Sequence, residues 1–269
     1  MTRFPPACKL TPDHAALRTR FAALGIALLL GTGCGDSAAP EAGGTVHLQL
    51  EHAAAGQPLV LQSMRYTNAA GSSYNVFELR YYLSGITLEA SDGTLVAGPA
   101  VVYRDQVDAA TEQATVQHVP PGHYSVLHFH FGLRPGDNVA GHLPATVANL
   151  LMQWPDVLGG GYHFMQLDGR YDNGMGADLG WAAHLGRLNR PSDLSPLDPS
   201  FDVALPISVH VQNDTWTLPV TMDVNRWFDN PVYDFRVVGG NNMSNRAALE
   251  ALHDNGADVF QAGTASREP

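Results

Sequence analysis

Alternation of apolar and polar residues with a period of two, repeated along most of the chain, limits the possible fold more than any other feature. It is clearest in VFELRYYLSGITLEA (76–90) and recurs at 45–52, 57–68, 94–105, 111–133, 162–171, 202–212 and 215–228. Because side chains alternate between the two faces of a strand, each segment is predicted to be a strand. Short strands separated by turns such as SDGT and PPGHY are typical of an all-β sandwich or barrel.

Two segments have a helical pattern instead, LPATVANLLMQW (143–154) and SNRAALEALHDNGADVF (244–260). In the second, Ser244 or Asn245 fits an N-cap and Gly256 fits the end of the helix. The chain shows no internal repeat and no linker that would divide it. We therefore expect one domain over residues 45–262, all-β with one or two short helices.

The N-terminal region has the pattern of an export signal. Arg18 and Arg20 precede FAALGIALLLGTGC, an apolar run that is too short for a membrane-spanning helix and ends at Cys34. A cysteine at this point is typical of a bacterial lipoprotein, with an ordinary secretory signal as the alternative. We expect a signal peptide at 1–33, lipidation of Cys34 and a flexible tether at 34–44. The lipid would anchor the protein to the outer membrane, in the periplasm or at the cell surface, without spanning the membrane.

Composition excludes several classes of site and partner. Cys8 and Cys34 are the only cysteines, so a chain that begins at Cys34 can form neither an internal disulfide nor a thiolate metal site. Removing residues 1–33 takes away four basic residues and one acidic residue, which changes the formal charge from −11 to −14. Lys9 is the only lysine. Such an acidic chain is a poor candidate for binding nucleic acid or for electrostatic adhesion to anionic lipid.

Histidine is the leading metal donor in a chain without further thiols, because imidazole suits copper and zinc. Of the 12 histidines, those that follow Cys34 are His47, His52, His118, His123, His128, His130, His142, His163, His184, His210 and His253. Their spacing has no strong metal signature, although His128 and His130 are two apart and share one face of a predicted strand. For any single histidine, an ordinary hydrogen-bonded role is the alternative.

The segment GGGYHFMQLDGRY (159–171) predicts a strand that follows a glycine hinge. Regular alternation would place His163, Met165 and Leu167 on one face, and Tyr162, Phe164 and Gln166 on the other. His163 is therefore expected on the more apolar face.

The overlapping segment DGRYDNGMGAD (168–178) is rich in Asp, Asn and Gly, as calcium loops are, but lacks their ordered ligand pattern. A wide turn is the preferred interpretation, with calcium as a second candidate cofactor. Catalysis is not expected, because the chain has no G-x-S-x-G motif and no cysteine nucleophile after the signal. A hydrolase with dispersed carboxylates is the weakest alternative.

Several motifs together resemble the MbnP-like family, whose members are periplasmic or surface copper-binding proteins first met beside methanobactin genes and related to methanotroph surface copper proteins. The resemblance covers roughly residues 45–260. Its motifs are FELRYYLSGITL (77–88), VPPGHYSVLHFHFGL (119–133), MQWPDVLGGGYHFMQLDGR (152–170), AAHLG (182–186), and DVNRWFDNPVYDF with GGNNMSNRAALEALHDNGADVF (223–260).

The resemblance implies a β-sandwich of antiparallel strands that binds copper through histidines and a tryptophan oxidised to kynurenine. A dihaem partner of the MauG or cytochrome c peroxidase type would make this modification, and an outer-membrane copper transporter is a further expected partner. Opening the indole ring exposes an aromatic amine and a ketone as new donors. Two neutral imidazoles and a weak third donor favour Cu(I) over Cu(II).

For the modified tryptophan, Trp154 is the first candidate and Trp181 the second, with a packed aromatic as the alternative for each. The expected ligands are four histidines: His163 and His184 first, His130 next and His142 in reserve. A different class of function remains open, a non-catalytic binding module for carbohydrate or a protein partner at the cell surface. Tyr81, Tyr82 and Tyr103 would then form an exposed aromatic surface.

Overall fold

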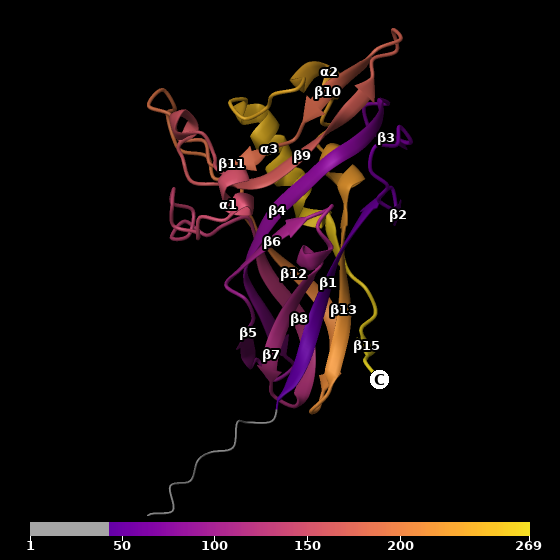
Figure 1. The fold of residues 1–269 in the computed structure, drawn as a ribbon, viewed down its shortest axis with the longest axis vertical. Coiled ribbons are helices and arrows are strands. Elements are labelled where there is room, and N and C mark those ends of the chain that lie inside the picture. Colours follow the sequence, from indigo (N-terminus) through magenta and orange to yellow (C-terminus); the bar gives the residue numbers. More distant parts are fainter. Residues whose placement is uncertain (1–42) are drawn as a thin grey trace, which may run out of the picture. The chain divides into compact units, whose positions relative to one another are not determined.

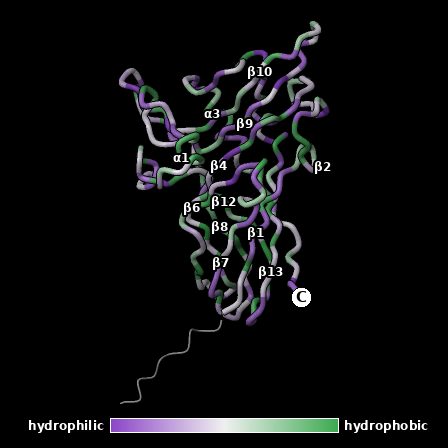
Figure 2. Tube along the Cα trace, in the orientation of Figure 1, coloured by the Kyte–Doolittle hydropathy of each residue, from purple (hydrophilic) through white to green (hydrophobic). Residues whose placement is uncertain are grey.

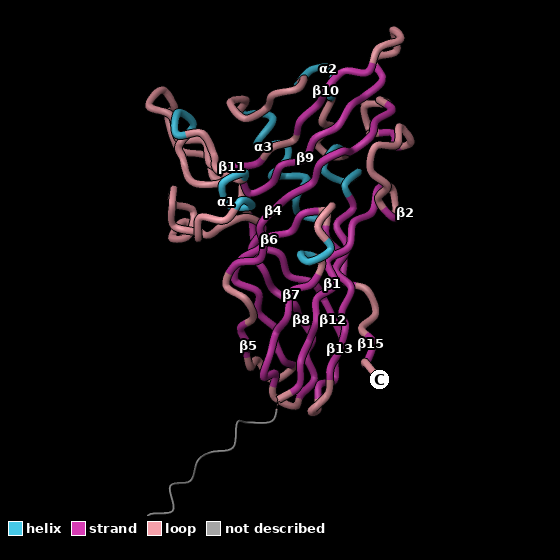
Figure 3. The backbone as a smooth tube through the Cα atoms, in the orientation of Figure 1, coloured by secondary structure: helices cyan, strands magenta, loops and turns pink. Residues whose placement is uncertain are grey.

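The computed structural model describes residues 43–269 (Figure 1). The expected signal peptide, Cys34 and nearly all of the expected tether lie outside the described residues. Strands dominate the described part, and helices occur only in the connections between them (Figure 3). None of the described helices is long and apolar enough to cross a membrane.

Two sheets make up the fold. The first has the order β14 (Phe260–Ala262), β13 (Thr215–Asp223), β1 (Gly44–Ala54) and β2 (Gln57–Pro58), with β15 (Ser266–Arg267) on β13 and β7 (Gln113–Val119) on β1. The second has the order β10 (Asp178–Ala182), β9 (His163–Asp172), β4 (Ser73–Ala90), β8 (Gly122–Phe131) and β12 (Phe201–Val211). Its short additions are β11 (Leu185–Gly186) on β9, and β3 (Tyr66–Thr67), β5 (Leu95–Ala97) and β6 (Val101–Asp105) on β4.

The predicted all-β sandwich is confirmed, with two differences. All paired strands are antiparallel except β1 and β13, which pair in parallel from Thr45↔Thr215 to Ala53↔Asp223. The described residues contain three α-helices rather than one or two: α1 (Val147–Leu151), α2 (Phe235–Val238) and α3 (Arg246–Asn255). Four 3-10 turns add to them: η1 (Ala109–Thr111), η2 (Asp156–Leu158), η3 (Val224–Phe228) and η4 (Gly256–Asp258).

Local sequence explains the main elements. In β1 every second residue is buried, which matches the alternation of apolar and polar residues along the strand (Figure 2). Helix α3 begins where the side chain of Asn245 accepts a hydrogen bond from the Ala248 N–H, and its C-cap is Gly256. Asn245, rather than Ser244, is therefore the N-cap.

Strand β4 joins the two ends of the second sheet. Its first part pairs with β9, from Tyr74↔Tyr171 to Tyr81↔Met165, and its second part pairs with β8, from Leu83↔Phe131 to Ala90↔Tyr124. At 18 residues it extends roughly 60 Å. The distance along β4 therefore estimates how far a residue on β8 lies from a residue on β9.

The expectation of an exposed aromatic surface formed by Tyr81, Tyr82 and Tyr103 is wrong for the two tyrosines of β4; Tyr103 lies on β6. Tyr81 and Tyr82 are each 1 % exposed, because β4 is covered on both faces at this point. Tyr81 packs edge-on against His52 of the first sheet, whereas the Tyr82 hydroxyl donates to Oδ1 of Asn149 in α1. Only Tyr103 is partly exposed. These residues therefore do not form a joint binding face.

Candidate metal centre

A loop between α1 and β9 folds back on itself and places Trp154 beside His163. The backbone N–H of Trp154 donates to the Gly161 carbonyl (3.0 Å), and the backbone N–H of His163 donates to the Met152 carbonyl (2.6 Å). Gly159, Gly160 and Gly161 all have positive φ, which glycine adopts without strain and which allows this reversal. The glycine hinge read in the sequence therefore brings a tryptophan and a histidine together.

Strand β9 starts with a bulge that changes the direction of His163. Leu185 of β11 pairs with Met165, but the next residue, Gly186, pairs with His163, so β9 has one extra residue here. Regular alternation consequently fails at the start of the strand. Nδ1 of His163 lies 3.5 Å from Nε2 of Gln166, a residue expected on the opposite face.

His184 lies just before β11 and is fixed by two neighbours. Its backbone N–H donates to Oδ1 of Asn242, and the Asn242 side-chain amide donates back to the His184 carbonyl (2.9 and 2.8 Å). Asn242 is completely buried. On the imidazole, Nε2 lies 2.8 Å from Oδ2 of Asp168, which projects from β9.

Trp154, His163 and His184 form a row of three rings with His163 in the middle. The ring centroids of Trp154 and His163 are 4.8 Å apart, and those of His163 and His184 are 5.1 Å apart, both in edge-to-face contact. Two imidazole nitrogens, each about 2.0–2.1 Å from one metal ion, would place their ring centres roughly 5 Å apart. The histidine pair therefore has the separation that one shared ion requires.

Gly186 makes room for the indole. A Cβ atom at this position would lie 2.4–2.8 Å from three ring carbons of Trp154, closer than a carbon–carbon contact allows. Trp154 thus packs directly on the backbone of β11, the strand that follows His184. This contact holds the indole against the histidine pair.

Hydrogen bonding leaves one nitrogen of each imidazole free. Nδ1 of His163 lies 3.2 Å from the Met152 carbonyl, which can only accept, so the proton is on Nδ1. The carboxylate of Asp168 likewise accepts from Nε2–H of His184. The remaining nitrogens, Nε2 of His163 and Nδ1 of His184, are buried and have no hydrogen-bond partner among residues 43–269.

Metal-binding histidines usually have this arrangement, in which a carbonyl or carboxylate holds one ring nitrogen and the other faces the ion. Nε1 of Trp154 and Oε1 of Gln166 are also buried without a partner in the described chain. Several unpartnered polar atoms in one buried place are costly unless a ligand satisfies them. His163 and His184 therefore fit as two ligands of a bound metal ion.

Electrostatics keeps His163 in the form that binds metals. Burial, followed by the charge of His184, lowers the pKa of His163 to about 4. His163 is then neutral at neutral pH, with its Nε2 lone pair available. Asp168 supplies a negative charge next to His184, which favours a cation at the pair.

The protein's own donors do not complete a metal site. No group of three or more His, Cys, Asp or Glu side chains within residues 43–269 is arranged to hold a metal ion. Two imidazoles alone provide a low coordination number, so a tightly held ion would need a further donor. The unmodified indole cannot serve, because its N–H is only a hydrogen-bond donor.

The other two candidate histidines lie elsewhere. His130 is on β8, which β4 separates from β9, and its Nδ1 lies 2.9 Å from Oδ1 of Asp202. His142 is in an exposed loop, with Nε2 3.4 Å from Oδ1 of Asp137. The structure thus joins His163 to His184, and places neither His130 nor His142 with them.

Trp181, the second tryptophan candidate, belongs to an aromatic core. Its ring stacks on Phe235 with a centroid separation of 4.5 Å and an interplanar angle of 9°, and it also meets Tyr74 and Phe228 edge-on. No histidine ring contacts it in the described part of the chain. The position of Trp181 is typical of a packing residue.

Reasoning from the sequence missed the residues that support the pair. From the sequence, Asp168 is only part of a candidate calcium loop, Gln166 is only a residue of the opposite strand face, and Asn242 has no assigned role. The 168–178 segment contains the end of β9, the connecting turn and the first residue of β10, which pairs with β9 from Asp172↔Asp178 to Asp168↔Ala182. Asp168 contacts His184. The sequence signal that could have indicated this role is the presence of Asp168 on the same predicted strand as His163.

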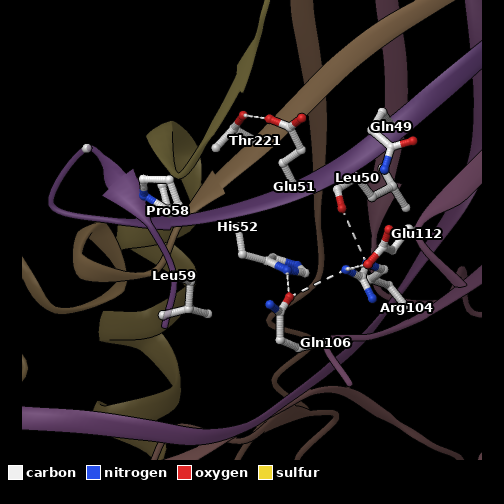
Figure 4. Close-up of a pocket in the computed structure, with 12 residues that line it drawn as sticks. Gln49, Leu50, Glu51, His52, Pro58, Leu59, Arg104, Gln106, Glu112 and Thr221 are labelled. Carbon is white, nitrogen blue, oxygen red and sulfur yellow. Dashed lines mark hydrogen bonds and ion pairs between the residues drawn. The ribbon is translucent and has the colours of Figure 1, made fainter. Parts of the chain in front are cut away.

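A pocket lies away from these rings, between β1, β2 and β6 (Figure 4). It has a volume of about 510 Å³ and contains His52, Arg104 and Gln106. His52 contacts Gln106 through Nδ1 and the Tyr81 hydroxyl through Nε2, and burial lowers its pKa to about 3. Because both nitrogens are engaged, His52 is not a free metal donor.

Comparison with known proteins gives two matches. The family model described as MbnP matches residues 43–244. The structure of MbnP from Methylosinus trichosporium aligns with a TM-score of 0.51 at 14 % sequence identity, covering 84 % of this chain and 99 % of that chain. At this identity the structural likeness shows the fold alone. None of the curated proteins compared matches the sequence.

Proposed function

Because this chain belongs to the MbnP family, we propose that it is a copper-binding protein of the bacterial periplasm or cell surface that captures or buffers copper. The ion would be held between Nε2 of His163 and Nδ1 of His184, and Cu(I) is favoured over Cu(II). The protein acts by binding and not by catalysis.

The observation that supports this proposal best is the pair of buried imidazole nitrogens without partners. Each ring is already held at its other nitrogen, by the Met152 carbonyl or by the Asp168 carboxylate. Two fixed imidazoles suit Cu(I), which tolerates few ligands, and the absence of thiols after Cys34 leaves histidine as the main donor. Bound copper would join the two histidines and satisfy both nitrogens.

The third donor would come from Trp154 after oxidation to kynurenine. Its Nε1 is buried beside His163 and has no partner in the described chain. Loss of four electrons and four protons, with two waters supplying oxygen, cleaves the C2–C3 bond of the indole and gives N-formylkynurenine. Hydrolysis then releases formate. The same nitrogen becomes a primary aromatic amine, which has a lone pair to offer.

A dihaem partner of the MauG or cytochrome c peroxidase type would remove these electrons. Trp154 is buried, so electron removal over a distance fits better than direct contact with a haem. Lipidation at Cys34 would keep the protein at the outer membrane, where a copper transporter is a further partner. Both partners and the lipid anchor rest on family membership and on the N-terminal sequence.

Mass spectrometry of protein from its native host tests this proposal, because trypsin separates all four tryptophans. Trp154 falls in peptide 105–170, since Arg134 precedes proline, and Trp181 falls in peptide 171–187. We expect peptide 105–170 to gain one oxygen and lose one carbon, the signature of kynurenine. Peptide 171–187 should be unchanged.

A Trp154→Phe variant from the same host is the matched control, and its peptide 105–170 should show no such change. Unmodified Trp154 in copper-loaded native protein would contradict the assignment. So would a change confined to peptide 171–187.

A further inference from the structure

A second pair of histidines faces each other across the two strands β8 and β12. His123 and His210 are direct partners in the ladder, and their ring centroids are 4.3 Å apart at an interplanar angle of 52°. His123 is partly exposed and His210 is exposed. Residues directly opposite on antiparallel strands have neighbouring Cβ atoms, so both imidazoles project from the same face.

Hydrogen bonds around His123 allow a tautomer with a free Nε2 lone pair. The Ser91 hydroxyl lies 3.2 Å from the His123 carbonyl, to which it can donate, and 2.8 Å from Nδ1 of the same histidine. In the tautomer with the proton on Nδ1, this hydroxyl accepts from Nδ1–H, as a second group does for a metal-binding histidine. On the other side, Nε2 has only a long contact to the Ser208 hydroxyl (3.3 Å), which an ion would displace.

His210 is unrestrained. Within residues 43–269 no hydrogen bond joins its ring to another group, and its contact is the ring of His123. Small side-chain rotations can thus bring both lone pairs to one ion, because the ring separation that a shared ion requires is roughly 5 Å. An exposed site leaves the remaining coordination positions to water.

We propose that His123 and His210 bind one divalent transition-metal ion of the borderline class, such as Zn(II) or Cu(II), at the protein surface. Imidazole is a good ligand for these ions, and the acidic chain attracts cations. The site is independent of the buried pair. His123 hydrogen-bonds to Ser91, just past the end of β4, whereas Met165, two residues from His163, pairs with Tyr81. Ser91 and Tyr81 are ten residues apart along the strand direction, so the two histidine pairs are on the order of 30 Å apart.

Calorimetric titration with zinc sulfate at neutral pH tests this proposal, using the full chain without a polyhistidine tag. We expect the parent to bind Zn(II) at this pair, and the single variants His123→Ala and His210→Ala each to weaken that binding tenfold or more, roughly the least that loss of a ligand causes. The unfolding temperature of the parent should rise with zinc, and that of the two variants should rise less. His210→Gln provides a second polar replacement at the exposed position.

Two controls separate this site from others. His128→Ala, on the same strand but opposite Ala204, should titrate like the parent. The double variant His163→Ala with His184→Ala should keep the zinc binding that depends on His123 and His210, whether or not the buried pair binds copper. Zinc binding that is unchanged in His123→Ala and His210→Ala, or absent from the parent, would overturn the proposal.

Discussion

Protein in which His163 and His184 are both replaced by alanine is expected to lose stoichiometric copper retention completely. Each imidazole offers one buried unpartnered nitrogen, and within residues 43–269 no group of three or more His, Cys, Asp or Glu is placed to hold a metal ion in their stead. Copper measured by elemental analysis after dialysis against EDTA, which strips ions from the exposed His123–His210 pair, should fall from about one ion per chain to background. The side chain at position 154 would be the single donor left at the buried site, and one donor cannot hold a soft ion.

The other two candidate ligands are the matched controls for this experiment. His142→Ala removes an exposed imidazole that Asp137 already contacts, and His130→Ala removes one that contacts Asp202. Both variants should retain copper like the parent. A His163/His184 double variant that folds and still binds copper like the parent would show that the site is elsewhere.

Acid is expected to destabilise the protein strongly, starting well above the pKa of its carboxyl groups. In the folded protein the pKa of His163 is lowered to about 4 and that of His52 to about 3, mainly by burial. The unfolded chain binds protons at the ordinary value of about 6.5. The unfolded state therefore takes up protons first as the pH falls, so stability is full above about 6.5 and declines below it.

The expected decline in the free energy of unfolding is up to about 1.4 kcal/mol per pH unit for each histidine. It should extend from about 6.5 down to about 4 for His163, and further for His52. Urea denaturation of metal-free protein at a series of pH values measures it. His163→Gln, which cannot titrate, should reduce the slope, whereas exposed His210→Gln should not. Equal slopes in the parent and His163→Gln would contradict the burial of a neutral imidazole.

Much of the sandwich could be predicted from the sequence because strand alternation is a local property. The long alternation at 76–90 became part of β4, and the GGG segment correctly indicated a hinge before His163. Pairing between distant strands has no such local signal. The parallel pairing of β1 with β13 joins residues about 170 positions apart, and only the folded chain shows it.

The candidate site could be predicted only in part, because only some of its contacts join residues that are close in the sequence. Trp154 and His163 are nine residues apart, and the intervening turn signals favoured their contact. His184 reaches them only through the pairing of β10 and β11 with β9, which also brings Asp168 of β9 to its imidazole. The bulge at His163 was equally hidden, because one extra residue in a ladder depends on the partner strand. Tyr81 and Tyr82 looked exposed because the segments that cover them lie far along the chain.

Anomalous X-ray scattering at the copper absorption edge, from crystals of copper-loaded native protein, locates the bound ion. We expect one strong peak between Nε2 of His163 and Nδ1 of His184, next to the side chain at position 154. A copper peak bound by other residues, with these two nitrogens left empty, would contradict it.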